Sequence, residues 1–209
     1  PMDRLRQGIE SVELSAGGGP AVARGIMTTD TRPKETAVRF GEYTLGGACK
    51  GAGMIHPQMA TTLCVITTDA AVPAPLLRRA LRRAAEESFN CISVDGDTST
   101  NDSFVVMATG QAGHAPITHL HSPQGQALLA AMQQVARQLA QAIVRDGEGV
   151  HRVVTVRVNG AKTIQDADVA ARAVANSALV KTSWHGGDPN WGRIIDAIGY
   201  SPATVVEEK

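Results

Sequence analysis

Residues 50–66 read KGAGMIHPQMATTLCVI, and the character of this stretch changes part-way along. Its first half carries two glycines, a lysine and a proline, which are typical of a loop. Its second half leads into residues 61–68, a β-branched and apolar run that predicts a strand. The stretch therefore predicts a flexible loop that enters a strand close to Thr61.

The rest of the chain alternates between strand-like and helix-like segments. We expect strands at residues 36–40, 43–48, 61–68, 91–94, 103–108, 150–158 and 180–183, and helices at residues 3–12, 21–27, 76–89, 124–145, 165–179 and 191–198. The first two strands flank Gly41-Glu42, which predicts a hairpin. We expect Trp184 and Trp191 to fill the core. Together these elements predict an α+β fold with sheets and helices in packed layers.

The composition excludes several classes of partner. The 209 residues carry no formal net charge, so nothing attracts the chain electrostatically to nucleic acid or to an anionic membrane. Aromatic residues make up only 3%, which argues against a base-stacking surface. Neither an apolar run of membrane-spanning length nor a signal peptide is predicted. Three cysteines without paired spacing favour a reducing, cytoplasmic compartment.

Thr61 follows a small residue, Ala60, and a loop that contains glycines. A threonine at a chain's N-terminus can act as a nucleophile, because its own α-amine (pKa roughly 7.7–8.0) serves as the base. Its hydroxyl would first attack the carbonyl of Ala60, and water would then release the acyl group. We therefore interpret Thr61 as a nucleophile freed by self-cleavage between Ala60 and Thr61. The residues alone leave an ordinary strand threonine open as the alternative.

Two charged residues beside glycines are further candidates. Lys50 fails the phosphate-binding pattern G-x-x-x-x-G-K-[ST] because Gly51 follows it, and both a carboxylate anchor and a surface lysine stay open. Glu148 lies between Gly147 and Gly149 in the turn that ends the long helix. A carboxylate there opposes the helix dipole, which prefers cations, and this hints at a functional role. A solvated surface charge is the alternative.

No metal site is predicted. Residues 95–102 (DGDTSTND) are rich in oxygen ligands, but Thr100 and Val106 stand where a calcium-binding EF-hand has Gly and Glu. The default interpretation is a turn that is hydrogen-bonded to itself. His185 has no Cys or His partner at the spacing of zinc ligands. Cys64 lies within an apolar strand, where a buried thiol is usually inert.

Six segments in the same order resemble the ornithine acetyltransferase (glutamate N-acetyltransferase) family of arginine biosynthesis, whose members belong to the N-terminal-nucleophile class. They are residues 26–34 (IMTTDTRPK), 50–54 (KGAGM), 59–61 (MAT), 89–90 with 94–102 (FN and VDGDTSTND), 146–149 (DGEG), and the motifs VKT, HG and DPNWGR within 180–193. The resemblance covers nearly the whole chain and corresponds to the central portion of family members.

The resemblance implies cleavage at Ala60–Thr61. Residues 1–60 would then be the C-terminal part of an α piece, and residues 61–209 the N-terminal part of a β piece that begins at the nucleophile. The two pieces would associate as an α2β2 heterotetramer. Thr61 would take the acetyl group from N-acetylornithine and pass it to glutamate. No cofactor is implied, although some members also use acetyl-CoA as the donor.

The resemblance also assigns substrate-binding positions to Thr28, Lys50, Thr61 and Glu148. Lys50 suits an α-carboxylate, Glu148 suits the ornithine side-chain ammonium, and Thr28 can hydrogen-bond the substrate. The chain departs from the family at Cys49, where Ala is typical, and at Thr62, where Met is usual.

Family members are longer at both ends, which places the Thr-Gly pair of the oxyanion hole upstream of this chain and the residues that close the site downstream. Two other functions stay open. One is a catalytically silent fragment that serves only in assembly. The other is an N-terminal-nucleophile amidohydrolase or aminopeptidase, in which Thr61 would pass its acyl group to water.

Overall fold

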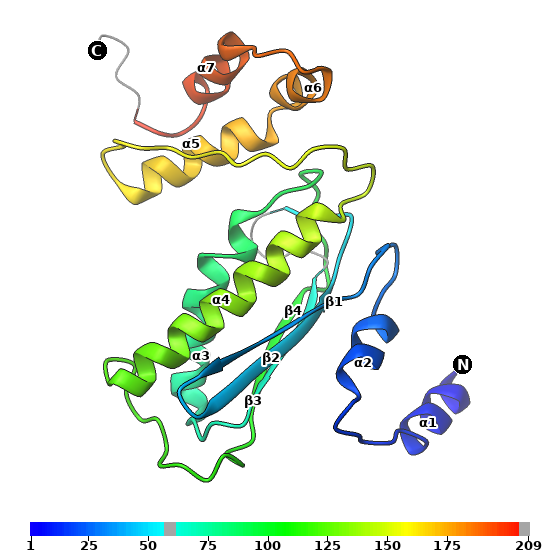
Figure 1. Ribbon diagram of the computed structural model, residues 1–209. Coiled ribbons are helices and arrows are strands. Elements are labelled where there is room, and N and C mark those ends of the chain that lie inside the picture. The colour runs from blue at the N-terminus through cyan, green and yellow to red at the C-terminus, as the bar shows by residue number, and fades with distance from the viewer. Residues whose placement is uncertain (57–61, 205–209) are drawn as a thin grey trace.

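The computed structural model describes residues 1–56 and 62–204. In chain order the elements are α1 (Met2–Glu10), α2 (Gly19–Gly25), β1 (Lys34–Phe40), β2 (Tyr43–Lys50), β3 (Leu63–Thr68), α3 (Ala74–Glu86), the 3-10 helix η1 (Phe89–Cys91), β4 (Ser103–Ala108), α4 (Pro123–Arg145), α5 (Ile164–Asn176), α6 (Ala178–Gly186) and α7 (Trp191–Gly199). Helices α3 and α4 cover one face of the sheet, and α5 to α7 lie beyond the end of α4 (Figure 1). The predicted α+β class is confirmed.

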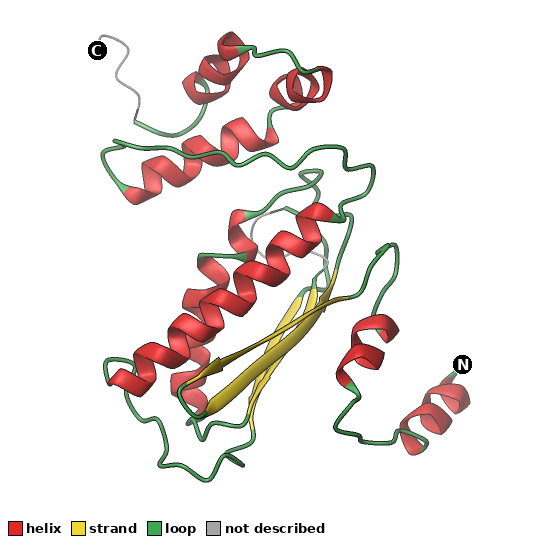
Figure 2. Ribbon diagram, viewed as in Figure 1, coloured by secondary structure: helices red, strands yellow, loops and turns green. Residues whose placement is uncertain are grey.

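The four strands form one mixed sheet in the order β1-β2-β3-β4. The sheet is drawn in yellow in Figure 2. β1 and β2 make the predicted antiparallel hairpin, and Gly41 at its turn has a positive φ of 58°. β3 pairs antiparallel with β2, from Leu45 opposite Thr68 to Lys50 opposite Leu63. β4 lies parallel to β3, and α3 lies in the crossover between them.

The main core lies between the sheet and the helices α3 and α4. Helix α4 buries a continuous apolar stripe from Leu128 to Ile143, as its helical periodicity predicts. Gly47 on β2 allows the layers to approach closely. A Cβ atom there would lie 2.9 Å from the Cγ1 atom of Ile66 and 3.3 Å from the Cδ1 atom of Leu139.

Helices α5, α6 and α7 share a small second core around Val174, Val180 and Ala197. Each of the three helices begins at a side-chain cap, supplied by Thr163, Ser177 and Asn190 respectively. Two hydrogen bonds join α5 to the main body. The guanidinium of Arg172 donates to the carbonyl oxygen of Asn90 at 2.6 Å, and the Ser93 hydroxyl donates to the Asn176 side chain at 2.5 Å.

Three of the predicted strands are wrong. Residues 91–94 follow η1 as irregular chain, because Phe89–Cys91 closes into a 3-10 turn after α3. Residues 150–158 run without helix or strand structure, since no ladder partner exists for them within the described residues. Residues 180–183 lie inside α6, because the Ser177 side chain caps the Val180 N–H and begins a helix there.

The expectation that both tryptophans fill the core is wrong for Trp191. Trp191 begins α7 and is 73% exposed, whereas Trp184 is partly buried against the second core. The hairpin, the strand at 103–108, the long helix and the helix from Trp191 are confirmed. None of the helices in the described part of the chain combines the length and apolar character that crossing a bilayer requires.

Candidate functional site

The predicted site residues lie on separate segments that converge at one end of the sheet. Thr28 is exposed in the loop after α2, Lys50 is the last residue of β2, and Glu148 is exposed in the turn after α4. Ala60 and Thr61 lie outside the described residues. The geometry of the site is therefore built from the segments that flank them.

Glu148 packs directly against the glycine loop that follows Lys50. Its N–H donates to the carbonyl oxygen of Ala52 at 2.8 Å. Its carboxylate occupies the space that a side chain on Gly53 would need, because a Cβ atom there would lie 2.8 Å from the carboxyl carbon. The turn itself depends on Gly149, which has a φ of 66°. The structure thus brings Glu148 to the loop next to Lys50, which the sequence could not show.

The acidic loop at residues 95–102 clamps the chain on both sides of the candidate nucleophile. Asp95 accepts hydrogen bonds from the N–H groups of Met54 (2.6 Å) and Ile55 (3.0 Å), and Asp102 accepts from the Thr62 N–H at 2.7 Å. Burial raises the pKa of Asp102, although the Thr62 N–H and the charge of Lys50 oppose that rise. Local sequence does not predict this role of Asp95 and Asp102; its only signal is the density of carboxylates in residues 95–102.

A buried ion-paired cluster, Asp30–Lys34–Asp146, lies next to the three positions that the sequence predicts to bind substrate. The Lys34 ammonium is 2.5 Å from Asp30 Oδ1 and 2.6 Å from Asp146 Oδ2. Asp30 also accepts from the backbone N–H groups of Gly51 (2.7 Å) and Thr28 (3.1 Å). Lys34 was not among the predicted site residues, because a charged side chain is usually exposed.

Hydrogen bonds keep the pKa of both carboxyl groups in this cluster below the ordinary value despite their burial. Burial alone would raise the pKa of Asp146, but hydrogen bonds from Lys34 and Thr31 lower it to about 2. Burial likewise acts to raise the pKa of Asp30, and the Gly51 N–H and Lys34 lower it overall. Both carboxylates are therefore ionised at neutral pH and hold Lys34 between them.

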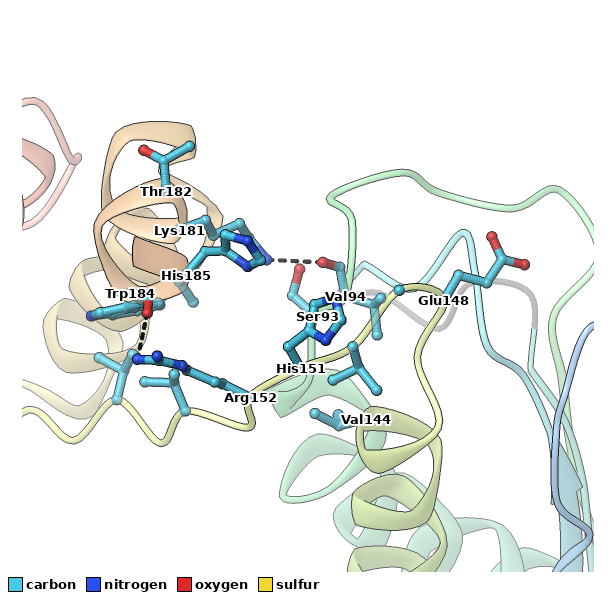
Figure 3. Close-up of a pocket in the computed structure, with 15 residues that line it drawn as sticks. Ser93, Val94, Val144, Glu148, His151, Arg152, Lys181, Thr182, Trp184 and His185 are labelled. Atoms are coloured by element: carbon cyan, nitrogen blue, oxygen red, sulfur yellow. Dashed lines mark hydrogen bonds between the residues drawn. The ribbon is translucent and has the colours of Figure 1, made fainter. Parts of the chain in front are cut away.

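A cavity of about 440 Å³ lies on the other side of the Glu148 turn. Lys181 at its wall donates to the carbonyl oxygen of Val94 at 2.9 Å, and Arg152 donates to that of Trp184 at 2.8 Å. Glu148 contributes to the wall, but its carboxylate points away from the cavity, as Figure 3 shows. The cavity and the surface that carries the Glu148 carboxylate are thus distinct.

The cysteines offer no alternative nucleophile in the core. Burial raises the pKa of the Cys49 thiol to about 12, and burial also raises that of Cys64 strongly. The described residues hold no group of three or more His, Cys, Asp or Glu side chains suited to a metal ion. The converging residues can therefore offer a cation, a carboxylate and hydrogen-bonding groups.

Comparison with known protein families gives a match to the ArgJ family over residues 1–209. The chain belongs to the ArgJ family. It is 51% identical over 209 residues to the arginine biosynthesis bifunctional protein ArgJ of Symbiobacterium thermophilum, covering 97% of this chain and 52% of that protein. It is 47% identical to the protein of the same name in Dehalococcoides mccartyi, covering 97% of this chain and 51% of the relative.

The fold agrees with a solved ArgJ structure. The crystal structure of arginine biosynthesis bifunctional protein ArgJ from Bacillus halodurans superposes with a TM-score of 0.64 at 45% identity, covering 68% of this chain and 66% of that one. The chain spans about half the length of the curated ArgJ relatives it matches. Membership of the ArgJ family, which the six sequence segments predict, is thereby confirmed.

Proposed function

We propose that the protein transfers an acetyl group from N-acetylornithine to glutamate through an acetylated Thr61. The proposal rests on one observation. Thr28, Lys50 and Glu148 belong to three segments that are far apart in the sequence, and these segments converge at the loop that leads to Thr61. Membership of the ArgJ family, whose relatives are named as bifunctional proteins of arginine biosynthesis, supports it.

In the first step the chain cleaves itself. The Thr61 hydroxyl attacks the carbonyl carbon of Ala60, its proton passes to the departing nitrogen, and the acyl group moves from nitrogen to oxygen. Water then hydrolyses the ester, which leaves a carboxylate on Ala60 and a free α-amine on Thr61. That amine becomes the base that the hydroxyl needs.

In the transfer cycle the Thr61 hydroxyl gives its proton to the α-amine and attacks the acetyl carbonyl of N-acetylornithine. Ornithine leaves with that proton, and an acetyl ester remains on Thr61. The amine of glutamate then attacks the ester carbonyl, the Thr61 oxygen leaves and takes up the proton that the amine loses, and N-acetylglutamate is released. Lys50 binds the substrate α-carboxylate, Glu148 binds the ornithine ammonium, and Thr28 donates a hydrogen bond. The proposal requires no cofactor, and acetyl-CoA is a second candidate donor.

Pairing across the cleavage point would keep the two pieces together. β2 belongs to the α piece and β3 to the β piece, and they share a six-residue antiparallel ladder. Lys34 of the α piece is also ion-paired with Asp146 of the β piece. These contacts would hold the two pieces together after a cut between residues 60 and 61. We further expect the pieces to assemble as an α2β2 heterotetramer in the cytoplasm.

Mass spectrometry of the protein expressed from its full reading frame tests both steps. We expect a new N-terminus at Thr61 and acetylation of that residue when N-acetylornithine is added without glutamate. Thr61→Ala should abolish cleavage and transfer, whereas Thr67→Ala, at an exposed threonine of β3, should retain both.

Three outcomes would contradict the proposal. Cleavage that persists in Thr61→Ala would remove Thr61 from the mechanism. Release of free acetate in place of transfer to glutamate would indicate an amidohydrolase. An uncleaved protein that resists acetylation would indicate a fragment that serves only in assembly.

A further inference from the structure

In the proposed function Thr28, Lys50 and Glu148 bind substrate, and one buried group of ion-paired residues contacts the segments that carry all three. Lys34, the first residue of β1, faces the core side of the sheet, where its ammonium bridges Asp30 and Asp146. The side chains of Lys34, Asp30 and Asp146 are only 2%, 0% and 5% exposed. Such burial is rare for charged side chains and occurs when they are paired.

The Asp30 carboxylate holds the first two substrate segments. Its Oδ2 atom accepts from the N–H of Thr28 at 3.1 Å, and its Oδ1 atom accepts from the N–H of Gly51 at 2.7 Å. Gly51 follows Lys50 directly and has a φ of 152°, which favours glycine. Asp30 therefore fixes the backbone of Thr28 and the backbone next to Lys50 at the same time.

The Asp146 carboxylate holds the third segment. It accepts from both the N–H (2.9 Å) and the hydroxyl of Thr31, and so ties the end of α4 to the Thr28 loop. Glu148 lies two residues further on, and its N–H is bonded to Ala52. The position of Glu148 relative to Thr28 thus depends on the same bridge.

Removal of the Lys34 ammonium would disturb the positions of all three segments that carry Thr28, Lys50 and Glu148. Two buried carboxylates would then face each other without a cation between them, and they would move apart or take up a proton. Either response alters the acceptors that hold Thr28, Gly51 and the end of α4. A surface ion pair would have no such effect, because water replaces the missing partner.

We propose that Lys34 is a positioning residue of the substrate site, which sets the spacing of Thr28, Lys50 and Glu148 by bridging Asp30 and Asp146. This inference rests on the proposed function for the meaning of the three positions. The bridge itself consists of contacts that can be tested without any activity.

The test compares Lys34→Met with Leu128→Ala, which removes a buried side chain at the opposite end of α4. We expect Lys34→Met to speed amide hydrogen exchange at Thr28, Gly51 and Glu148 together. We also expect its KM for N-acetylornithine to rise about tenfold, the loss typical of one charge-assisted hydrogen bond, with a smaller change in kcat. Leu128→Ala should lower stability and leave both the three amides and KM unchanged.

Asp30→Asn provides a milder variant, because it keeps the ion pair between Lys34 and Asp146. It should speed exchange at Thr28 and Gly51 but not at Glu148. Full protection of all three amides in Lys34→Met, or an equal rise of KM in Leu128→Ala, would overturn the inference. Loss of protection at the three amides in a protein without acetyl transfer would support the bridge and contradict the proposed function alone.

Discussion

Gly53→Ala is expected to weaken substrate binding without weakening the fold. A Cβ atom at residue 53 would lie 2.8 Å from the carboxyl carbon of Glu148, closer than any normal contact. The obstructing atoms are the end of a flexible, exposed side chain, so Glu148 would rotate away while the backbone stays in place. Gly53 has no positive φ, and alanine fits its backbone. The substitution should therefore displace the Glu148 carboxylate without straining the backbone.

The size of the effect follows from the hydrogen bond that Glu148 would lose. A hydrogen bond to a charged group contributes about 1.5–3 kcal/mol. The KM for N-acetylornithine should therefore rise about 10- to 100-fold. The free energy of unfolding should change by less than about 1 kcal/mol, because alanine also restricts the unfolded chain.

A double-mutant cycle with Glu148→Ala makes this prediction specific. Without the carboxylate there is nothing for a side chain on residue 53 to displace, so Gly53→Ala should add no further loss in that background. Steady-state kinetics of the four proteins measure the coupling. Gly8→Ala, at a glycine with open space around it, is the matched control and should behave as the parent. Losses that simply add in the double variant would refute the reasoning.

Two further predictions concern stability. The pKa of Asp146 falls from its ordinary value of 3.8 to about 2 in the folded protein, which is worth about 2 kcal/mol. That contribution is complete above about pH 5 and is lost as pH falls through 2, so urea unfolding should show a smaller acid dependence in Asp146→Asn; a parallel loss in both proteins would contradict it. Gly47→Ala should destabilise the fold by about 1–3 kcal/mol, because its Cβ atom would lie 2.9 Å from Ile66, whereas Gly46→Ala, with its nearest contact at 3.4 Å, should cost less. Equal melting temperatures for these two variants would argue against close packing at residue 47.

Local sequence patterns predict the elements that bury one face against the core. Helix α4 shows a long 3.6-residue period, and the β1–β2 hairpin shows strand alternation around a glycine turn, so both were predictable. Residues 150–158 have the same alternation, but a strand also needs a partner, which a local pattern cannot reveal. In α6 the helix start given by Ser177 outweighs the β-branched residues that suggested a strand.

The candidate site was predictable only in part, for a related reason. Lys50 and Glu148 are marked by neighbouring glycines, and the oxygen-rich loop at 95–102 is marked by its composition. Lys34 carries no such mark, and its partner Asp146 lies 112 residues away. One signal was available: Lys34, Thr36, Val38 and Phe40 alternate along β1, which places the lysine on the face that carries Phe40. A lysine on the core side of a strand calls for a buried carboxylate.

The ion-paired bridge of Lys34 with Asp30 and Asp146 also affects the expected consequence of self-cleavage, because it joins residues on both sides of the cut. A cut between Ala60 and Thr61 falls in the sequence between β2 and β3, which are paired from Leu45 to Lys50. Asp102 would still hold the N–H of Thr62, one residue from the new α-amine. The cut would then free the nucleophile while leaving the surrounding contacts in place. The native contacts should change little on cleavage, because the buried bridge and the sheet both span the cut.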